Sequence, residues 1–341
     1  MSRTRSCAAP GTPSSWRTAR RSESLGPIHV IANPNAAGGK GARAIPPVQR
    51  LLERAGADFI LHLTEAPRHA EAIAAQARDA GAWRILVVGG DGTIHEVVSG
   101  LLSGKGFGAG TPPLPAIAVF PVGTGNDFHR LIRAPKGPEA AVRALLGGTE
   151  RAFDVGHARW QGGEGHFVNL VGVGIDVEVL RNRPRFAKLP GLLQYLAAFV
   201  PALAGFRPLS LQVTFEGQGT PGETIEAPVL ISAVTVGHSI GGGFLVSPDA
   251  RPDDGLLDLF LVEKLGLGKV IRYLPGILRG SLNGKPEVHQ AQVTRVEIRP
   301  MDGRPLSFEL DGELMADETP SLAIQVLPRC LPILEPAGEA A

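Results

Sequence analysis

Residues 89–93 (GGDGT) have the composition of a loop that binds a phosphate group. Glycine lets the backbone approach a phosphate closely, and the N–H groups at the start of a following helix point toward it. Asp91 adds a carboxylate, which repels a phosphate unless a cation lies between them. The motif therefore indicates a nucleotide with Mg²⁺ nearby. A tight strand–helix turn with the aspartate as a local cap is the alternative interpretation.

Two further polar loops contain glycine and follow apolar runs of the same kind. Residues 33–41 (NPNAAGGKG) include Lys40, and residues 122–128 (VGTGNDF) include Asp127. In an α/β sheet, ligands bind at the carboxyl ends of the strands. Three such loops at one sheet edge favour a nucleotide site over three unrelated turns.

The elements that must position these loops alternate along the first part of the chain. Apolar, β-prone runs predict strands at residues 28–32, 59–63, 85–88 and 117–121. Helical spacing predicts helices at about residues 44–55 and 67–80, and another from about residue 93. Alternation of strands with helices predicts an α/β domain with a parallel, doubly wound sheet over residues 27–150.

From about Arg151 the pattern changes to serial short strands separated by Gly, Pro, Asp and Asn. This predicts a β-rich domain over residues 151–332, arranged as an antiparallel sandwich or sheet. Whether its last strand returns to the first domain stays open. The strands are expected at residues 153–158, 166–173, 209–215, 229–236, 257–262, 292–299, 306–310 and 322–326.

Residues 189–206 (LPGLLQYLAAFVPALAGF) form an uncharged apolar stretch within the β-rich part. A membrane-spanning helix needs about 20 apolar residues, and two prolines interrupt this stretch, so a span is disfavoured. A buried helix or a lipid-facing helix is expected. Basic residues on both sides are consistent with a helix that lies at a bilayer surface.

Length and composition restrict the class of protein. A chain of 341 residues suggests two domains, and a net charge of +1 gives no indication of nucleic-acid binding. Cys7 and Cys330 lie near opposite ends, which predicts neither a disulfide framework nor a zinc site and fits a reducing cytoplasm. Residues 1–26 lack the apolar segment of a secretory signal and are expected to be a disordered tail, with residues 333–341 as a second tail.

Six motifs in order resemble the diacylglycerol kinase catalytic-domain family, in particular the soluble bacterial diacylglycerol kinases. Sphingosine and ceramide kinases belong to the same group. The motifs are Asn33-Pro34 with residues 38–41, residues 89–93 with Glu96, residues 121–124 with residues 126–128, Asn169 with Gly172 and Gly174, Pro248 with residues 253–255, and residues 311–313. The resemblance implies an α/β domain of the NAD kinase and diacylglycerol kinase type, followed by a β-sandwich domain.

The resemblance also implies an ATP site, in which backbone N–H groups hold the phosphates. Asp91 and Asp127 would face a catalytic Mg²⁺, and a second, structural Mg²⁺ would bind the side chain of Asp254 with the carbonyl groups of Arg251 and Leu256. The residues that match the nucleotide site are Asn33, Lys40, Thr64, Gly90, Asp91, Gly92, Thr93, Ile94, His95, Glu96, Thr124, Asn126 and Asp127.

Asp311 and Glu313 match the catalytic acids of the family, and Glu313 is favoured as the base that takes the proton from a lipid hydroxyl group. Phosphoryl transfer needs positioning, cations on the developing charge and such a carboxylate. In an extended segment, residues two apart face the same side, so both carboxylates can address one site. An exposed hairpin turn is the alternative interpretation of Asp-Gly-Glu.

His95 departs from the family pattern, which usually carries Asn at this position. Histidine still donates a hydrogen bond, but its geometry differs and it titrates near neutral pH. The nucleotide contacts at this position are therefore open. The other histidines show no spacing typical of metal ligands.

The sequence leaves three functions open. The first is an ATP- and Mg²⁺-dependent lipid kinase that phosphorylates diacylglycerol or a related lipid, is cytoplasmic and contacts the membrane transiently at its periphery. The second is a kinase of soluble nucleotides, similar to NAD kinase, and the third is a catalytically silent nucleotide- or lipid-binding regulator. An edge strand of the β-rich domain also allows a homodimer.

Overall fold

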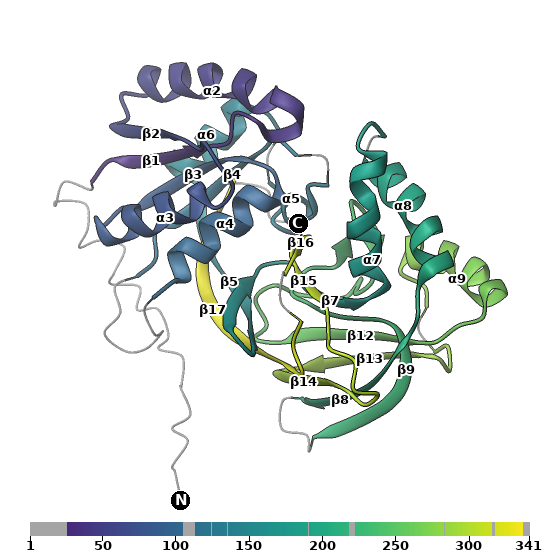
Figure 1. Cartoon of the computed structure of the whole chain (residues 1–341). Coiled ribbons are helices and arrows are strands. Elements are labelled where there is room, and N and C mark those ends of the chain that lie inside the picture. The colour runs from purple at the N-terminus through teal and green to yellow at the C-terminus, as the bar shows by residue number, and fades with distance from the viewer. Residues whose placement is uncertain are drawn as a thin grey trace, which may run out of the picture.

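The computed structural model describes residues 26–104, 113–123, 125–134, 136–189, 191–217, 222–282, 284–315 and 318–336. The predicted N-terminal tail therefore lies outside the described residues, except for residue 26. Figure 1 shows an N-terminal part built from strands and helices, and a larger part dominated by strands.

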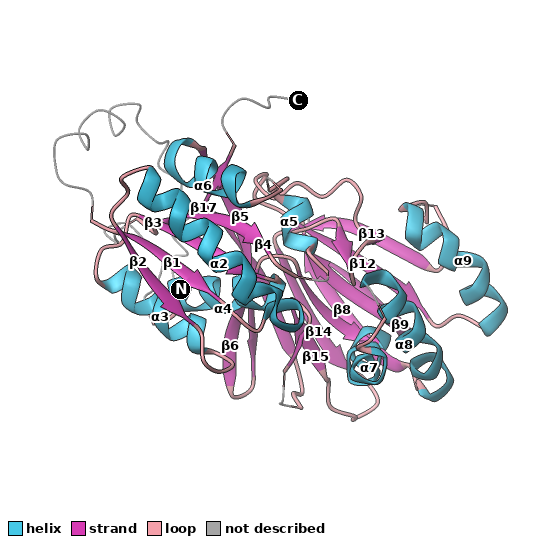
Figure 2. Ribbon diagram, turned by 90° about the horizontal axis from the view of Figure 1, so that it is seen from above, coloured by secondary structure: helices cyan, strands magenta, loops and turns pink. Residues whose placement is uncertain are grey.

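The N-terminal part is a parallel sheet with helices on both faces, as predicted. Helices α3 and α4 pack on one face, and helices α2 and α6 on the other, so the inner strands are buried on both faces and are mostly apolar (Figure 2). The strands are β1 (Ile28–Ala32), β2 (Phe59–Leu63), β3 (Arg84–Gly89) and β4 (Ala116–Pro121), in the order β4-β3-β1-β2. The helices are α2 (Ala36–Arg54), α3 (His69–Asp79), α4 (Asp91–Leu102), α5 (Asp127–Leu131) and α6 (Pro138–Gly147).

The two helices that follow glycine-rich loops begin earlier than the sequence predicts. Helix α4 begins at Asp91, directly after Gly90. Helix α2 begins at Ala36, but Ala37, Gly38 and Gly39 have positive φ angles, so its first turn is not regular helix. The short helices α5 and α6 lie in a region where the sequence analysis named no helix.

The second part consists of antiparallel strands whose inner faces enclose one apolar core. The strand predicted at residues 166–173 is two strands, and so is the strand predicted at residues 292–299. The strands are β5 (Thr149–Trp160), β6 (Gly163–Phe167), β7 (Leu170–Gly174), β8 (Leu209–Glu216), β9 (Glu223–Thr235), β10 (Ser239–Ile240), β11 (Phe244–Leu245), β12 (Leu257–Glu263), β13 (Val288–Val293), β14 (Arg295–Pro300), β15 (Phe308–Leu310), β16 (Glu313–Leu314) and β17 (Leu322–Glu335).

Strand β17 joins the two parts into one sheet. It pairs antiparallel with β5 and β14, and further along Ile333 pairs in parallel with Ile117 of β4. The last strand therefore does return to the first domain, and it runs to Glu335, beyond the predicted start of the C-terminal tail. Because hydrogen bonds continue across both parts, the loops of the parallel sheet are held in a fixed relation to the β-rich part.

Helices α7 (Ile175–Asn182), α8 (Gly191–Gly205) and α9 (Leu267–Arg279), together with the 3₁₀ helix Arg183–Phe186, form a group beside the β-rich sheet. Helix α8 is the uncharged stretch for which the sequence predicts a helix, whereas α7 and α9 were not predicted. Their apolar side chains pack against Phe260 and Val262 of β12. Within the described ranges, none of the helices combines the length and the apolar character that a bilayer crossing requires.

Candidate active site

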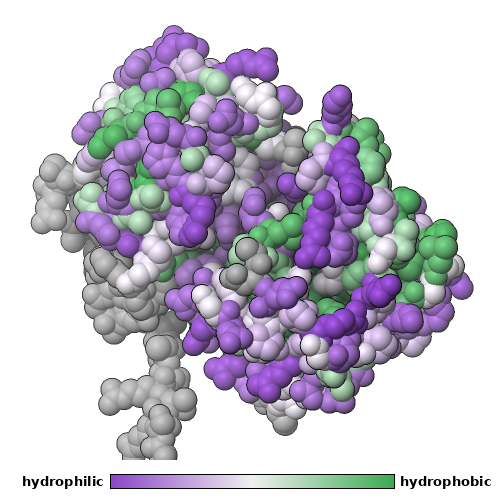
Figure 3. Space-filling view, in the orientation of Figure 1, coloured by the Kyte–Doolittle hydropathy of each residue, from purple (hydrophilic) through white to green (hydrophobic). Residues whose placement is uncertain are grey.

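A cavity of about 1290 Å³ runs from the carboxyl ends of the parallel strands to the space beneath α7, α8 and α9. It lies between the two parts of the molecule, which Figure 3 shows from one side. Its polar end is lined by Asn33, Thr64, Gly90, Asp91, Thr93 and Glu96, and its apolar end by Val179, Phe199, Leu230, Phe260, Val262 and Tyr273. One cavity therefore offers a polar and an apolar binding region.

At the polar end, the glycine-rich loops touch one another. A Cβ at Gly90 would lie 3.1 Å from the Cα of Gly123, so the loops after β3 and β4 approach closely only because both residues are glycine. The side chain of Asn33 donates a hydrogen bond to the Thr93 hydroxyl at 3.2 Å, which ties the loop after β1 to the start of α4. The N-cap residue of α4 is Gly90, which has no side chain that could cap the helix. The first N–H groups of α4 are therefore available to an anion at this end of the cavity.

Asp91 links two of these loops. Its carboxylate accepts hydrogen bonds from the backbone N–H groups of Asp127 (3.3 Å) and Phe128 (3.2 Å), at the start of α5. Burial and the nearby charge of Asp127 raise the pKa of Asp91 to about 6. An opposite charge beside this carboxylate would offset both effects, so the environment of Asp91 suits a cation.

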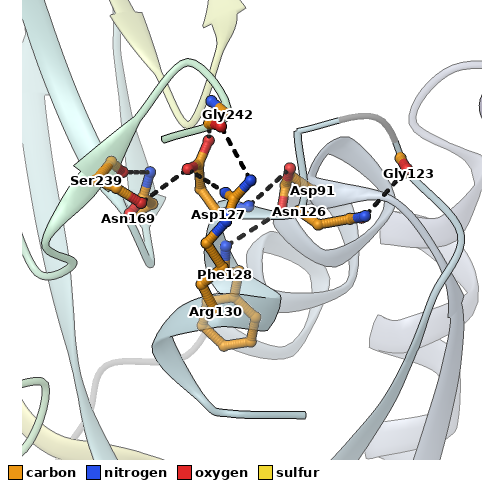
Figure 4. Close-up of polar contacts among 9 residues, drawn as sticks. All are labelled: Asp91, Gly123, Asn126, Asp127, Phe128, Arg130, Asn169, Ser239 and Gly242. Atoms are coloured by element: carbon orange, nitrogen blue, oxygen red, sulfur yellow. Dashed lines mark hydrogen bonds and ion pairs between the residues drawn. The ribbon is translucent and has the colours of Figure 1, made fainter. Parts of the chain in front are cut away.

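Asp127 has hydrogen-bond partners in the β-rich part, and the expectation that it faces a metal ion stays a prediction. Its carboxylate accepts hydrogen bonds from the Ser239 hydroxyl (2.8 Å) and the backbone N–H of Gly242 (2.7 Å), and it forms an ion pair with Arg130 (Figure 4). Asp127 opens the short helix α5, which lies against the segment that contains β10. Its carboxylate therefore connects the two parts of the molecule at the rim of the cavity.

Eleven of the predicted nucleotide and catalytic residues line the cavity: Asn33, Thr64, Gly90, Asp91, Gly92, Thr93, His95, Glu96, Asp127, Asp311 and Glu313. Lys40 is exposed on α2 and does not line the cavity, because the irregular first turn of α2 takes the chain past it. Ile94 is buried on the apolar face of α4. The side chain of Asn126 donates to the carbonyl group of Gly123, and Thr124 lies outside the described residues.

Glu96 has a local structural role within the nucleotide region. Its carboxylate accepts the backbone N–H of Ala70 at 3.1 Å, near the start of α3. It thereby satisfies one of the N–H groups that a helix N-terminus leaves unpaired. Glu96 therefore orients α3 against α4 at the edge of the cavity.

The Asp311 carboxylate is saturated with hydrogen bonds. Its Oδ1 atom accepts the N–H groups of Asn169 (2.8 Å) and Leu170 (3.0 Å), and its Oδ2 atom accepts the N–H of Val168 (2.9 Å) and contacts His95 Nδ1 (3.0 Å). Only 3% of the side chain is exposed. A carboxylate whose acceptor positions are all used is a poor base, so Asp311 positions other groups.

Glu313 is exposed, and its carboxylate has a different neighbour from the carboxylate of Asp311. A Cβ at Gly92 would lie 3.1 Å from Glu313 Oε1, so this carboxylate reaches the first turn of α4. The expectation of an extended segment at residues 311–313 is wrong. Leu310 pairs with Glu313, and Asp311 and Gly312 form a two-residue turn with φ angles of 50° and 87°. The two carboxylates therefore have different partners and different roles.

His95 bridges the two parts of the molecule through its contact with Asp311. Burial alone lowers the pKa of His95, but the hydrogen bond and the charge of Asp311, with Glu313 and Glu71, raise it overall. Nδ1 faces Asp311 Oδ2, so the tautomer with a proton on Nδ1 is favoured. The histidine thus occupies the usual Asn position as a donor to Asp311.

The predicted structural metal site lies beside a second, smaller cleft of about 500 Å³. Asp249, Arg251, Asp254 and Asp258 line this cleft, whereas Leu256 does not. Asp254 Oδ1 accepts the N–H of Leu256 at 3.0 Å, and burial with the charges of Asp254 and Asp249 raises the pKa of Asp258 to about 7. In the described part of the chain, no group of three or more His, Cys, Asp or Glu side chains converges as a metal site.

Two cavity residues, Asp176 and Glu309, were missed by the sequence analysis. Asp176 is the second residue of α7, and Glu309 lies in β15 between Phe308 and Leu310, whose side chains enter the core. An alternating strand pattern predicts that Glu309 faces away from the core. It does not predict that Glu309 meets a residue of α7.

Comparisons with known proteins agree with this geometry. The model of the diacylglycerol kinase catalytic domain matches residues 27–158, and the model of the YegS C-terminal NAD kinase beta sandwich-like domain matches residues 169–335. A diacylglycerol kinase of Bacillus subtilis is 29% identical over 288 residues, covering 83% of this chain and 88% of the relative. A probable YegS-like lipid kinase of Pseudomonas aeruginosa is 31% identical over 314 residues, covering 91% and 95%.

A solved structure supports the fold. The crystal structure of a diacylglycerol kinase from Bacillus anthracis superposes with a TM-score of 0.63 at 20% sequence identity, and it covers 92% of this chain and 98% of that chain. The α/β part with a parallel sheet and the antiparallel β-rich part therefore occur in the same arrangement in a related structure.

We predict that His95→Asn lowers stability by about 1 kcal/mol at pH 5.5, and by less at higher pH. The pKa of His95 is raised in the folded state, so its contribution is fully present below pH ~6.5 and is lost as the pH rises through the folded-state pKa. Melting temperatures of the wild type and the variant between pH 5 and 9 measure this. His289→Asn, which removes a surface histidine paired with Glu263, is the matched control. A difference that does not change with pH would contradict the charged pair.

Proposed function

This chain belongs to the diacylglycerol kinase catalytic-domain family and is a lipid kinase, and we propose that it transfers the γ-phosphoryl group of ATP, with Mg²⁺, to the hydroxyl group of diacylglycerol or a related lipid. One observation carries the proposal: the polar and apolar regions belong to one cavity, and Glu313 lines this cavity and reaches the first turn of α4. A kinase of a soluble nucleotide does not need the apolar region.

The polar region suits the phosphates of ATP. The N-terminus of α4 provides unpaired N–H groups and the positive end of the helix dipole. The glycines at positions 90 and 123 let the loops after β3 and β4 pack closely together at this end of the cavity. Thr64, Asn33 and Thr93 add hydroxyl and amide groups at the same end of the cavity.

Asp91 is the residue best suited to hold Mg²⁺ near these phosphates. Its oxygens are hard ligands, and its raised pKa reflects burial and a like charge that a cation would offset. When bound, Mg²⁺ would neutralise negative charge on the phosphates. Asp127 is less suited, because Ser239, Gly242 and Arg130 already occupy its carboxylate.

The second Mg²⁺ site remains part of the proposal. Three carboxyl groups line the cleft beside Asp254, and burial together with the charges of Asp254 and Asp249 raises the pKa of Asp258. A divalent cation there would relieve the repulsion among these groups. Carboxylate oxygens together with backbone carbonyl groups are typical ligands of a hard cation. This site lies outside the main cavity, and its role would be structural.

We assign the proton transfer to Glu313. The lipid hydroxyl group gives its proton to the Glu313 carboxylate while its oxygen forms a bond to the γ-phosphorus, and the bond from that phosphorus to the bridging oxygen breaks to leave ADP. Glu313 is exposed in the cavity, whereas the Asp311 oxygens are fully hydrogen-bonded. Asp311 therefore acts as a positioning residue that fixes the turn carrying the base.

The apolar region suits the acyl chains of the lipid. Side chains from α7, α8, α9 and the β-rich sheet line it, including Val179, Phe199, Leu230 and Tyr273. An acyl chain placed there would be removed from water, which stabilises binding by roughly 25 cal/mol per Å² of buried apolar surface. Its hydroxyl-bearing end would then face Glu313.

The outer surfaces of α8 and α9 suit contact with a bilayer. Leu193 and Val200 on α8, and Leu267 and Ile271 on α9, are each more than half exposed. Figure 3 shows apolar side chains gathered over these two helices. Arg272 of α9 and Lys188, just before α8, could meet anionic head groups next to them.

The proposed chemistry predicts that Glu313→Gln lowers kcat by about 10³-fold while the melting temperature stays unchanged, because only the base is lost. Asp311→Asn is expected to lower both activity and stability, since an amide cannot accept all the hydrogen bonds that the carboxylate accepts. The assay is transfer of labelled γ-phosphate from MgATP to a panel of lipids in mixed micelles, with NAD as a soluble acceptor.

Glu226→Gln, at an exposed position near the start of β9, is the matched control and should keep wild-type activity. Label on NAD alone would overturn the lipid acceptor. Full activity of Glu313→Gln would remove Glu313 as the base, without affecting the lipid assignment.

A larger side chain in the apolar region should make the enzyme use long-chain lipids less well than short-chain lipids. Val179→Phe places extra volume at the wall formed by α7, so we expect the KM for long-chain diacylglycerol to rise about 10-fold while dioctanoylglycerol is used normally. Ile60→Phe on the surface of β2 is the control. Equal effects on both lipids would mean that the acyl chains bind elsewhere.

Charges introduced into the outer surface of α8 and α9 should weaken membrane contact. We expect the double variant Val200→Glu with Ile271→Glu to sediment less with vesicles of phosphatidylcholine and phosphatidylglycerol, and to phosphorylate a dispersed short-chain lipid normally. The double variant Ile60→Glu with Leu146→Glu provides the same charge change at two other exposed apolar residues. Equal loss of sedimentation in that control would refute the assigned surface.

A further inference from the structure

Two carboxyl groups, those of Asp176 and Glu309, meet over Gly172 beneath α7. A Cβ at Gly172 would lie 1.7 Å from Asp176 Oδ2 and 2.8 Å from Glu309 Oε1, so both oxygens lie within 3 Å of one point. Gly172 belongs to β7 and pairs with Glu309 of β15. The glycine therefore leaves the space in which the two carboxyl groups come together.

This contact is unfavourable unless a proton lies between the two groups. Among the residues that the structure describes, buried Asp176 Oδ2 has no hydrogen-bond partner, and Glu309 is 3% exposed. Two ionised carboxylates at this separation would repel each other in a site with little water. A single shared proton converts the repulsion into a hydrogen bond and gives Asp176 Oδ2 the partner that it lacks.

The electrostatic surroundings of Asp176 and Glu309 also favour a protonated pair. Burial raises the pKa of Asp176 to about 7, and burial together with the charge of Asp176 raises the pKa of Glu309 well above its usual value. The other charged groups that act on Glu309 are Asp311 and Glu313, and both raise its pKa further. The pair therefore retains its proton near neutral pH.

Glu309 is also bonded directly to the turn that carries the proposed base. Its Oε2 atom accepts the backbone N–H of Gly312 at 2.6 Å. In a two-residue hairpin turn closed by Leu310 and Glu313, this N–H has no partner in the strand ladder. Glu309 thus fixes the peptide between Asp311 and Glu313 from one side, while the Asp311 carboxylate fixes it from the other.

We propose that Glu309, joined to Asp176 by a shared proton, is a positioning residue that holds Glu313 at the reacting end of the cavity. The proposal rests on the assignment of Glu313 as the base. It connects α7, which forms a wall of the lipid-binding region, to the catalytic turn. When the proton is lost, the two carboxylates repel each other. The Glu309 carboxylate then moves, and the hydrogen bond that it accepts from the Gly312 N–H is displaced.

The first test is kinetic. Glu309→Ala should lower kcat by about 10–100-fold with the KM for lipid within about 2-fold, because misplacing a catalytic group by a fraction of an ångström affects turnover rather than binding. Glu309→Gln should keep most of the wild-type kcat at pH 7. Its amide can accept from Gly312 and donate to Asp176, which replaces the shared proton by a permanent N–H group.

The second test is the pH profile. Wild-type kcat should decline as the pH rises from 7 to 9, and Glu309→Gln and Asp176→Asn should each reduce that decline. Glu178→Gln, two residues further along α7 at a surface carboxylate paired with Arg181, is the matched control and should keep the wild-type profile. Wild-type kcat in Glu309→Ala, or an unchanged decline in Glu309→Gln, would overturn the proposal.

The third test does not depend on activity. The raised pKa values mean that the pair destabilises the folded state increasingly as the pH rises from about 4 through 7. The melting temperature of Glu309→Gln relative to the wild type should therefore rise between pH 5 and pH 8. A difference that stays constant over this range would exclude the shared proton. If the wild type phosphorylated none of the lipids, both the proposed function and the positioning role of Glu309 would be refuted. The melting temperatures would still show whether Asp176 and Glu309 share a proton.

Discussion

The Asp311 carboxylate is the contact on which the active-site geometry depends. It accepts three successive backbone N–H groups from the start of β7, and it meets His95 of α4 from the N-terminal part. A buried carboxylate with this many hydrogen-bond donors is held firmly in one position. It therefore fixes three things at once: the hairpin turn between β15 and β16, the entry into β7, and the distance between the turn and α4. Glu313 reaches the phosphate-binding end only because this turn is fixed.

Other contacts also connect the N-terminal part of the molecule to the β-rich part. Asp127 reaches from α5 to Ser239 and Gly242, and strand β17 pairs with strands of both parts. Together these contacts hold the polar region and the apolar region of the cavity in a fixed relative position. This arrangement is what a lipid kinase requires, because a charged nucleotide and an acyl chain must present their reacting atoms at one point.

Much of the fold follows from local pattern. The four parallel strands and the helices that separate them were predicted because each strand is mostly apolar and each helix has one apolar face. Helices α7 and α9 were not predicted because they lie among short strands, although the apolar residues of α9 recur with clear helical spacing. The predicted strand at residues 166–173 is interrupted at Val168 and Asn169, where the backbone N–H groups turn to the Asp311 side chain instead of a neighbouring strand. The residues around this break carry no sequence signal for a hydrogen-bond partner as distant in the chain as Asp311.

The sequence by itself determined the family and the glycine-rich loops at the carboxyl ends of the parallel strands, because glycines and Asp91 between a strand and a helix act over a few neighbouring residues. It also identified Asp311 and Glu313 as a pair, but not their separate roles. Only the tertiary structure decided that Asp311 is buried and saturated while Glu313 is exposed, and that Glu309 meets Asp176 over Gly172. The reason is physical: the burial, charge and proton affinity of a carboxyl group depend on which distant strands and helices become its neighbours.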